Sequence, residues 1–179
     1  MGPQSFRYGR SFFFLRALLL LVLFSFALAF LGIQTVTPGP WVALIAVLFV
    51  LHLAVVGLSP VLTNHELLRS RVILRQGWYF KAIIPLDHAE SIGPWDGEAK
   101  YGLRLSLGRR TLFVVGSGQN LVSIRLRAPR RFSQVLFLQA REIVFDVDDR
   151  DRFLAAVEER VTAERLPARK IAVLPAAGR

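Results

Sequence analysis

The stretch that decides the fold is FFFLRALLLLVLFSFALAFLGI at residues 12–33, followed at residues 41–58 by WVALIAVLFVLHLAVVGL. Each segment supplies about the 20 apolar residues that a helix needs to cross a hydrocarbon core of about 30 Å. Arg16 is the only charged residue in either segment, and neither segment has the single polar stripe of a core-facing helix in a soluble protein. The sequence therefore predicts two transmembrane helices, at about residues 12–33 and 41–59, in an N-terminal unit of residues 1–62.

The connector between these segments, residues 34–40, reads QTVTPGP and carries no charge, which predicts a short extracytoplasmic turn. Basic residues flank the pair on both outer sides: Arg7, Arg10 and Arg16 before or at the start of the first segment, and Arg69, Arg71 and Arg75 after the second. Positively charged flanks stay in the cytoplasm. We therefore expect a multi-pass protein of the cytoplasmic cell membrane with both termini in the cytoplasm.

Two residues are predicted to lie at the membrane interface. Arg16 lies about one turn inside the first segment, where a long side chain can return its charge to the headgroups. Trp41 opens the second segment, and an amphipathic indole suits the interfacial region.

A cleaved signal peptide is the alternative for the first segment. Arg7 and Arg10 would form its basic region, and Ala27, Leu28 and Ala29 resemble a small-x-small cleavage site. The apolar run continues through residues 30–33, which favours an uncleaved span. In either case the second segment leaves the remainder of the chain in the cytoplasm.

Composition limits the chemistry of that remainder. All thirteen acidic residues of the 179-residue chain follow Leu62, although the net charge is +10. The chain has no cysteine, which excludes disulfides, thiolate metal sites and a cysteine nucleophile, and which agrees with a cytoplasmic domain.

Residues 63–163 read as one mainly β domain that ends in a helix. Short runs separated by turn signals predict strands at residues 71–76, 78–84, 91–95, 103–107, 111–115, 121–126 and 143–147. Apolar and polar residues alternate in the fourth and sixth of these runs, which indicates an antiparallel sheet with one wet face. Asp148 and Asp149 are expected to cap a closing helix, whose Phe153 and Val157 face the core while Arg160 faces elsewhere. Residues 164–179 are expected to be a flexible tail.

This pattern predicts a β-sandwich or open barrel that is closed by its C-terminal helix. Three stretches, LTNHEL at residues 62–67, VILRQG at 72–77 and IPLDHAESI at 84–92, resemble the prokaryotic PH-like (bacterial pleckstrin-homology) domains. The closing DRDRF at residues 149–153 is similar to the family's Asp-Pro-x-x-Phe helix, and the sequence departs from the pattern at Ala89 and Arg150. The resemblance implies a PH-like domain behind a membrane helix pair. It implies no catalytic residue and no ligand, because the family has none in common.

The strongest functional signal is a basic tract between residues 99 and 141 that no Asp or Glu interrupts. Arginine pairs with phosphate in a two-pronged geometry, and a cytoplasmic leaflet of anionic lipid attracts such a tract. The residues predicted to bind an anionic headgroup are Arg104, Arg125, Arg127, Arg130 and Arg131. The first three are expected on neighbouring strands, opposite the leucine face. The alternative is a solvated strand face. The stretch at residues 129–138 is either an interfacial segment or part of the core.

Other polar residues have ordinary explanations. His52, inside the second segment, is either a functional group or a neutral histidine bonded to Ser25 or a backbone carbonyl, and the second is favoured. The turn residues His65, Glu66, Asp87, His88 and Glu90 form no metalloenzyme motif, and the chain has no nucleophile elbow or phosphate loop. The sequence therefore predicts neither an enzyme nor a cofactor nor a metal site.

These observations predict a membrane-anchored PH-like binding module at the cytoplasmic face, which recognises anionic lipid headgroups or a protein partner. The alternative is a structural subunit of a membrane complex, or of a homo-oligomer, with no ligand of its own. Nucleic acid binding is disfavoured, because exposed aromatic residues are not interleaved with the arginines as a stacking surface requires.

Overall fold

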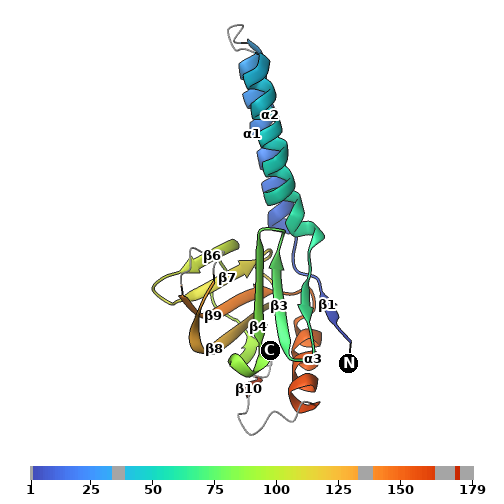
Figure 1. Cartoon of the computed structure of the whole chain (residues 1–179), viewed down its shortest axis with the longest axis vertical. Coiled ribbons are helices and arrows are strands. Elements are labelled where there is room, and N and C mark those ends of the chain that lie inside the picture. The colour runs from blue at the N-terminus through green and yellow to red at the C-terminus, as the bar shows by residue number, and fades with distance from the viewer. Residues whose placement is uncertain (1, 34–38, 133–138, 164–171, 174–179) are drawn as a thin grey trace.

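A computed structural model describes residues 2–33, 39–132, 139–163 and 172–173 (Figure 1). A rod of two apolar helices stands on a β domain, and one helix, α3, covers an end of that domain. The elements in chain order are β1 (Gln4–Phe6), α1 (Ser11–Ile33), α2 (Gly39–His52), η1 (Leu53–Leu58), η2 (Ser59–Leu62), β2 (His65–Leu67), β3 (Arg71–Gln76), β4 (Phe80–Pro85), η3 (Leu86–His88), β5 (Ala89–Pro94), β6 (Gly102–Ser106), β7 (Thr111–Val115), β8 (Leu121–Arg131), β9 (Gln139–Asp146), α3 (Arg150–Ala163) and β10 (Ala172–Val173).

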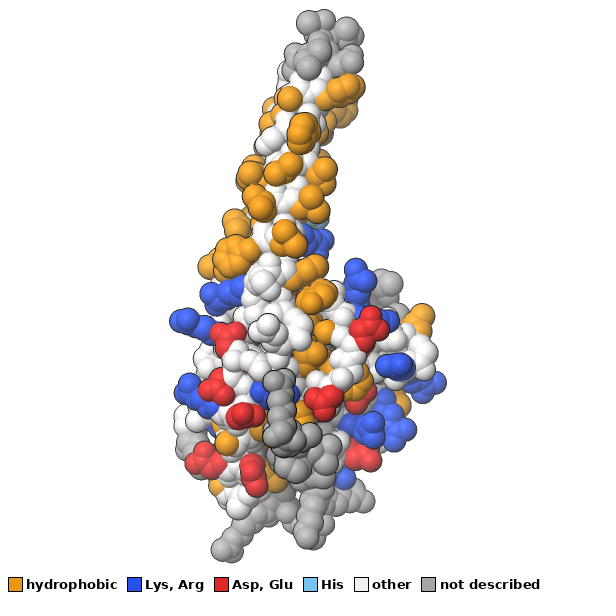
Figure 2. All heavy atoms as spheres, turned by 180° about the vertical axis from the view of Figure 1, so that it is seen from behind, with side chains coloured by type: hydrophobic (Ala, Val, Ile, Leu, Met, Phe, Trp, Pro, Cys, Tyr) orange, Lys and Arg blue, Asp and Glu red, His pale blue; other side chains and the backbone are white. Residues whose placement is uncertain are grey.

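The rod is formed by α1 packed against α2, which continues through a π-helical turn, η1, and a 3-10 turn, η2. The rings of Phe24 and Phe49 stack at 3.7 Å, and Gly57 lies against Ala17, so the two helices run antiparallel. The stretches Ser11–Phe30 and Gly39–Leu62 are long and apolar enough to cross a membrane. Hydrophobic side chains cover the rod, while Lys and Arg side chains lie at its foot (Figure 2). Both expected helices are present, and most of the expected turn, residues 34–38, lies outside the described residues.

The β domain consists of two sheets. The four-stranded sheet has the order β1-β2-β3-β4, and the six-stranded sheet has the order β10-β5-β8-β9-β7-β6. The expected mainly β domain with a closing helix is therefore confirmed in outline. The expected antiparallel pairing holds for most strand pairs, but β7 pairs with β9, and β10 with β5, in parallel. After β7 the chain first forms β8, on the other side of β9, and then turns back antiparallel to β8 to form β9. The strand β9 therefore runs in the same direction as β7.

The helix α3 closes the space between the sheets. Phe153 is fully buried, and its ring meets Phe6 of β1 at 5.1 Å and Phe145 of β9 at 5.5 Å, both edge to face. Asp149 caps the helix, since its Oδ1 accepts a hydrogen bond from the Arg152 amide at 3.0 Å. Both features agree with the sequence analysis.

The N-terminal segment before the rod belongs to the β domain, which the sequence analysis did not anticipate. Gln4–Phe6 pair with β2, and Phe6, Tyr8 and Phe13 are all buried. The division expected at residue 62 therefore separates residues that share one sheet. Cleavage after Ala29 would remove β1 and these aromatic rings from the core, so the fold favours an uncleaved chain.

Arg160 of α3 holds the same segment. Arg160 is only 1% exposed, although the helical pattern placed it away from the face that carries Phe153 and Val157. The guanidinium donates to the carbonyls of Gly2 at 3.2 Å and Ala156 at 3.1 Å, and to Gln4 Oε1 at 3.4 Å. It lies inside because the N-terminal segment supplies the acceptors that a buried guanidinium needs.

The end of the chain is described only in part. Ala172 and Val173 form β10, which pairs in parallel with β5. The rest of the expected tail, residues 164–171 and 174–179, lies outside the described residues, as do residues 133–138 of the possible interfacial segment. Phe132, the residue before position 133, is buried, with 4% of its surface exposed.

Candidate functional site

Two of the predicted arginines, Arg104 and Arg125, lie on the outer face of the six-stranded sheet. Arg104 of β6 lies in one cross-strand row with Phe113, Val144 and Ser123, and Ser123 is two positions before Arg125 on β8. Paired residues, and residues two apart on one strand, point to the same side of a sheet. Arg104 and Arg125 therefore share a face, as predicted. They do not lie on neighbouring strands, because β7 and β9 run between β6 and β8.

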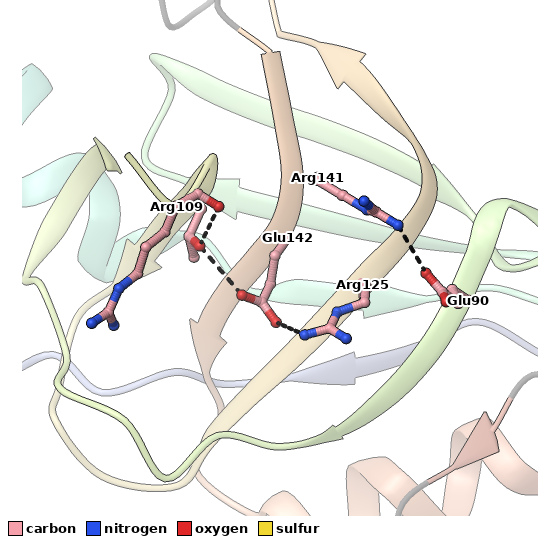
Figure 3. Close-up of polar contacts among 6 residues, drawn as sticks. Glu90, Arg109, Arg125, Arg141 and Glu142 are labelled. Atoms are coloured by element: carbon pink, nitrogen blue, oxygen red, sulfur yellow. Dashed lines mark hydrogen bonds and ion pairs between the residues drawn. The ribbon is translucent and has the colours of Figure 1, made fainter. Parts of the chain in front are cut away.

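The fold brings two acids from outside the basic tract onto this face (Figure 3). Glu142 lies 3.8 Å from the Arg125 guanidinium, and its other oxygen accepts a hydrogen bond from Thr111 Oγ1 at 3.3 Å. Glu90 reaches across β8 to Arg141 at 3.9 Å. The absence of acids within the tract therefore does not make the face purely basic. Strand register decides which acids lie opposite, and the sequence did not reveal that register.

Arg127 and Arg130 have structural partners. Arg127 Nε donates to the carbonyl of Asp87 at 3.0 Å, and Arg130 donates to the carbonyl of Ile83 at 2.6 Å. The Arg130 guanidinium also lies over the ring of Phe132, 5.9 Å from its centre. Together they tie the end of β8 to β4 and η3, next to a small pocket of about 160 Å³ lined by His88, Leu126, Arg127, Ala128 and Arg130. These two predicted ligand residues thus also hold the fold together.

The remaining cations of this region are free to meet a ligand. Within the described part of the chain, the exposed side chains of Arg104, Arg109 and Arg131 have no acidic partner and no hydrogen-bond acceptor. The Arg109 guanidinium points away from Glu142 in Figure 3. We define Arg104, Arg109, Arg125, Arg131 and Arg141 as the basic face.

The foot of the rod holds a second polar cluster, which the sequence analysis missed. The buried Asp146 carboxylate accepts hydrogen bonds from the amides of Gly9 at 2.7 Å, Gly116 at 2.7 Å and Ser117 at 2.9 Å. Burial raises the pKa of Asp146 to about 6, although these hydrogen bonds act in the opposite direction. A Cβ on Gly9 would lie 2.1 Å from Ser117 Cβ, so the N-terminal segment meets the β7–β8 turn with no space between them.

His65 lies in the same cluster and is fully buried. Its Nδ1 accepts a hydrogen bond from the Arg75 amide at 3.2 Å, its ring stacks on Tyr8 at 4.6 Å, and its Nε2 has no partner among the described residues. Burial lowers the pKa of His65 to about 3, so the ring is neutral at physiological pH. Tyr8 hydrogen-bonds to Thr63 Oγ1 at 2.9 Å and to the Pro60 carbonyl, and burial raises its pKa to about 12. The cluster joins the rod to the β domain.

The other candidates for chemistry do not come together. Glu66 pairs with Arg75 at 3.3 Å, away from the buried His65, and His88 lines the small pocket. No three His, Asp or Glu side chains of the described residues are grouped as a metal ion requires. The expectation of a hairpin turn at residues 116–120 is wrong, because this segment joins β7 to β8 and β9 lies between those two strands. The segment borders an open pocket of about 500 Å³, lined by Trp95, Asp96, Gly97, Gly118, Gln119, Asn120, Leu121 and Arg150.

The residues expected at the membrane interface lie at opposite ends of the rod. Trp41 is exposed near the far end of the rod. Arg16 is half-buried at the foot of the rod, one residue before Ala17, which contacts Gly57. His52 does not bond to Ser25, whose hydroxyl donates to the Leu21 carbonyl at 2.9 Å. The His52 imidazole is exposed on the rod and has no hydrogen-bond partner among the described residues. The favoured interpretation of His52 is therefore not seen.

Comparison with known proteins adds nothing to this geometry, since no protein-family model, no curated protein and no solved structure matches the chain.

Proposed function

We propose that the chain is a PH-like binding module, anchored in the cytoplasmic membrane by α1 and α2, whose basic face binds anionic lipid headgroups at the cytoplasmic leaflet. The PH-like assignment is supported by two sheets with a C-terminal helix between them. The parallel pairing of β7 with β9 departs from the antiparallel sheet that the alternation of apolar and polar residues indicated.

The observation that supports an anionic ligand is the excess of positive charge on the basic face. Two of its five arginines have an acidic partner, Arg125 at 3.8 Å from Glu142 and Arg141 at 3.9 Å from Glu90. The Glu142 side chain is only 15% exposed, whereas Arg141 and Glu90 are both about half exposed. Exposed pairs of this kind contribute about 0–1 kcal/mol to stability. A phosphate that accepts two hydrogen bonds from the Arg141 guanidinium can therefore replace Glu90 at little cost.

The N-terminal strand supports the proposed topology. Residues on both sides of the rod, Gln4–Phe6 before it and β2 after it, pair in one sheet. This shared attachment supports a pair of helices that cross the membrane together, with their connector on the side opposite the β domain. The basic flanks favour the cytoplasm for the β domain and both termini.

The test compares two triple variants of the full chain in mild detergent. Arg104→Ser, Arg125→Ser and Arg131→Ser remove positive charge from the basic face. Arg69→Ser, Arg71→Ser and Lys81→Ser remove the same charge from exposed positions in or beside β3 and β4.

Native mass spectrometry then counts the phosphatidylglycerol molecules retained by each protein, with phosphatidylcholine as the neutral comparison. The face variant should lose phosphatidylglycerol and the control variant should keep it. Retention by the wild type should weaken as salt is added, because exposed charges are screened. Equal retention by the two variants would contradict the proposal.

A second candidate, an assembly subunit, is favoured by His52. An imidazole N–H facing hydrocarbon without an acceptor is costly, and a neighbouring helix could supply one. In that case His52→Leu should release a co-purified membrane protein or a second copy of the chain, whereas Leu51→Ala, next to it on the rod, should not. No change in either variant would argue against this candidate.

A further inference from the structure

The turn between β3 and β4, residues 77–79, lies directly beneath the foot of the rod (Figure 1). The Trp78 amide donates to Ser59 Oγ at 3.1 Å, and the Gly77 amide donates to Thr63 Oγ1 at 2.9 Å. Ser59 begins η2, the last turn of the second apolar stretch, and Thr63 follows it. The turn is therefore held at the level where that stretch ends.

The contact between the turn and the rod is close. Gly77 has a φ of +65°, and a Cβ there would lie 2.3 Å from Ser59 Oγ. Any other residue at position 77 would both strain the backbone and push the turn away from η2. The backbone of Trp78 is therefore held at a fixed position relative to the rod by hydrogen bonds to the Ser59 and Thr63 hydroxyls.

Trp78 leaves its indole uncovered, with 67% of the residue exposed. Leu58 and Leu62, at the end of the rod, are exposed at 46% and 69%. Large apolar side chains grouped on a surface mark a contact with another apolar phase. Tryptophan in particular favours the membrane interface, because its ring is apolar and its N–H can bond to water or headgroups.

The spacing to Trp41 fits a bilayer. Trp41 is 59% exposed near the far end of the rod. Eighteen positions separate it from Ser59, which corresponds to roughly 27 Å of helix. A hydrocarbon core is about 30 Å thick. Trp41 and the backbone of Trp78, which is bonded to Ser59, are therefore separated along the rod by about the thickness of that layer.

Positive charge accompanies Trp78 at its boundary. Burial raises the pKa of Tyr79, the next residue in the turn, and the nearby Arg16 charge acts in the opposite direction. Arg16 thus lies close to the turn, where lipid phosphates would lie. A partner of mixed apolar and anionic chemistry suits this surface, as the headgroup region of a bilayer does.

We propose that Trp78 inserts into the boundary between headgroups and acyl chains, so that the β3–β4 turn docks the β domain onto the leaflet from which the rod emerges. The occupant is lipid because the apolar rod itself brings the bilayer to this level. The contact rests on the proposed membrane anchoring and does not depend on the basic face or its ligand.

The test uses the full chain reconstituted in phosphatidylcholine and phosphatidylglycerol vesicles. The chain has three tryptophans, Trp41, Trp78 and Trp95, and each is isolated by changing the other two to Phe. Lipids brominated near the top of the acyl chains should quench the Trp78-only and Trp41-only proteins to a similar extent. The Trp95-only protein, whose indole packs on Phe113 within the β domain, should keep its emission.

Quenching of Trp41 without quenching of Trp78 would overturn the docking contact alone. Absence of quenching at both would overturn the anchoring and the contact together. Because Trp95→Phe can disturb the fold, a second measurement leaves Trp95 in place. A spin label on Trp78→Cys, in a chain with no natural cysteine, should relax more with oxygen than with an aqueous nickel reagent.

The matched control is the label on Gly108→Cys in the β6–β7 turn, where an added Cβ meets nothing within 4 Å. That label should respond mainly to the aqueous reagent. The same aqueous response at both positions would overturn the proposal.

Discussion

Removing the ring of Phe6 should destabilise the whole β domain, although the residue lies before the first apolar helix. Phe6 is 5% exposed, and its ring meets Phe153 of α3 at 5.1 Å with the planes at 83°. Truncation of a buried phenylalanine to alanine costs about 3–5 kcal/mol, because apolar contacts are lost and a cavity remains. We therefore expect Phe6→Ala to lower the free energy of unfolding of the β domain by about 3–5 kcal/mol.

The two rings should also be coupled. An edge-to-face pair contributes about 0.5–1.5 kcal/mol beyond the area that it buries. The cost of Phe6→Ala should therefore be smaller by about that amount when Phe153 is already alanine, which a double-mutant cycle measures. Phe26→Ala is the control, because Phe26 is 71% exposed on the rod and should leave the β domain unchanged.

Amide hydrogen exchange of β3, β8 and β9 in the detergent-solubilised full chain is the assay, since the slowest amides report global opening. A loss of 3–5 kcal/mol corresponds to an increase in opening of roughly two to three and a half orders of magnitude. An increase below about tenfold for Phe6→Ala would refute the docking of the N-terminal strand. It would also restore the possibility that the first segment is removed by cleavage.

Three further outcomes are expected. Burial favours protonated Asp146 in the folded chain, so its contribution to stability is full below pH 3.8 and is lost as pH rises through about 6. Burial favours neutral His65, so stability falls as pH drops from 6.5 toward about 3 and the unfolded chain binds the proton. These two effects oppose each other between about pH 4 and 6. Asp146→Asn leaves only the His65 effect, so the thermal midpoint of that variant should fall as the pH is lowered through this range, and His65→Phe leaves only the Asp146 effect, so its midpoint should rise. A thermal midpoint that does not change with pH in either variant would contradict the burial argument. Gly9→Ala should lower the midpoint in the same assay, because the added methyl group would overlap Ser117; an unchanged midpoint would show that the two segments are not in contact. Gly77→Ala should remove the quenching of Trp78 by brominated lipid, because the turn can no longer rest on Ser59; retained quenching would contradict that dependence.

The sequence predicted those elements whose signal is local. The strands at residues 71–76 and 111–115 coincide with β3 and β7, and the Asp149 cap lies where the helix pattern placed it. The strand β1 has only three residues and no alternation to reveal it, and it exists because β2 offers an edge. Arg160 illustrates the same limit. Helical periodicity assigns an arginine to solvent, and only the fold shows that the carbonyl of Gly2 and the side chain of Gln4 come to meet it.

The sequence predicted which arginines belong to the candidate site, but it did not predict how they are arranged or what they contact. The sequence gathers Arg104, Arg125 and Arg127 in one tract, yet strand order places β7 and β9 between β6 and β8. Arg127 and Arg130 bond to backbone carbonyls of Asp87 and Ile83, which no side-chain pattern reports. Glu142 follows the tract in sequence and lies opposite Arg125 because of a cross-strand register that forms only on folding.

The central claim is that a membrane-crossing helix pair places the N-terminal strand and the β domain together in the cytoplasm. Because the chain has no cysteine, single cysteines at Ser5, Gly39 and Gly108 give a direct measurement with a membrane-impermeant maleimide. Intact cells should label Gly39→Cys alone, and lysed cells should label Ser5→Cys and Gly108→Cys as well. Labelling of Gly108→Cys or Ser5→Cys in intact cells, or protection of Gly39→Cys there, would contradict the account.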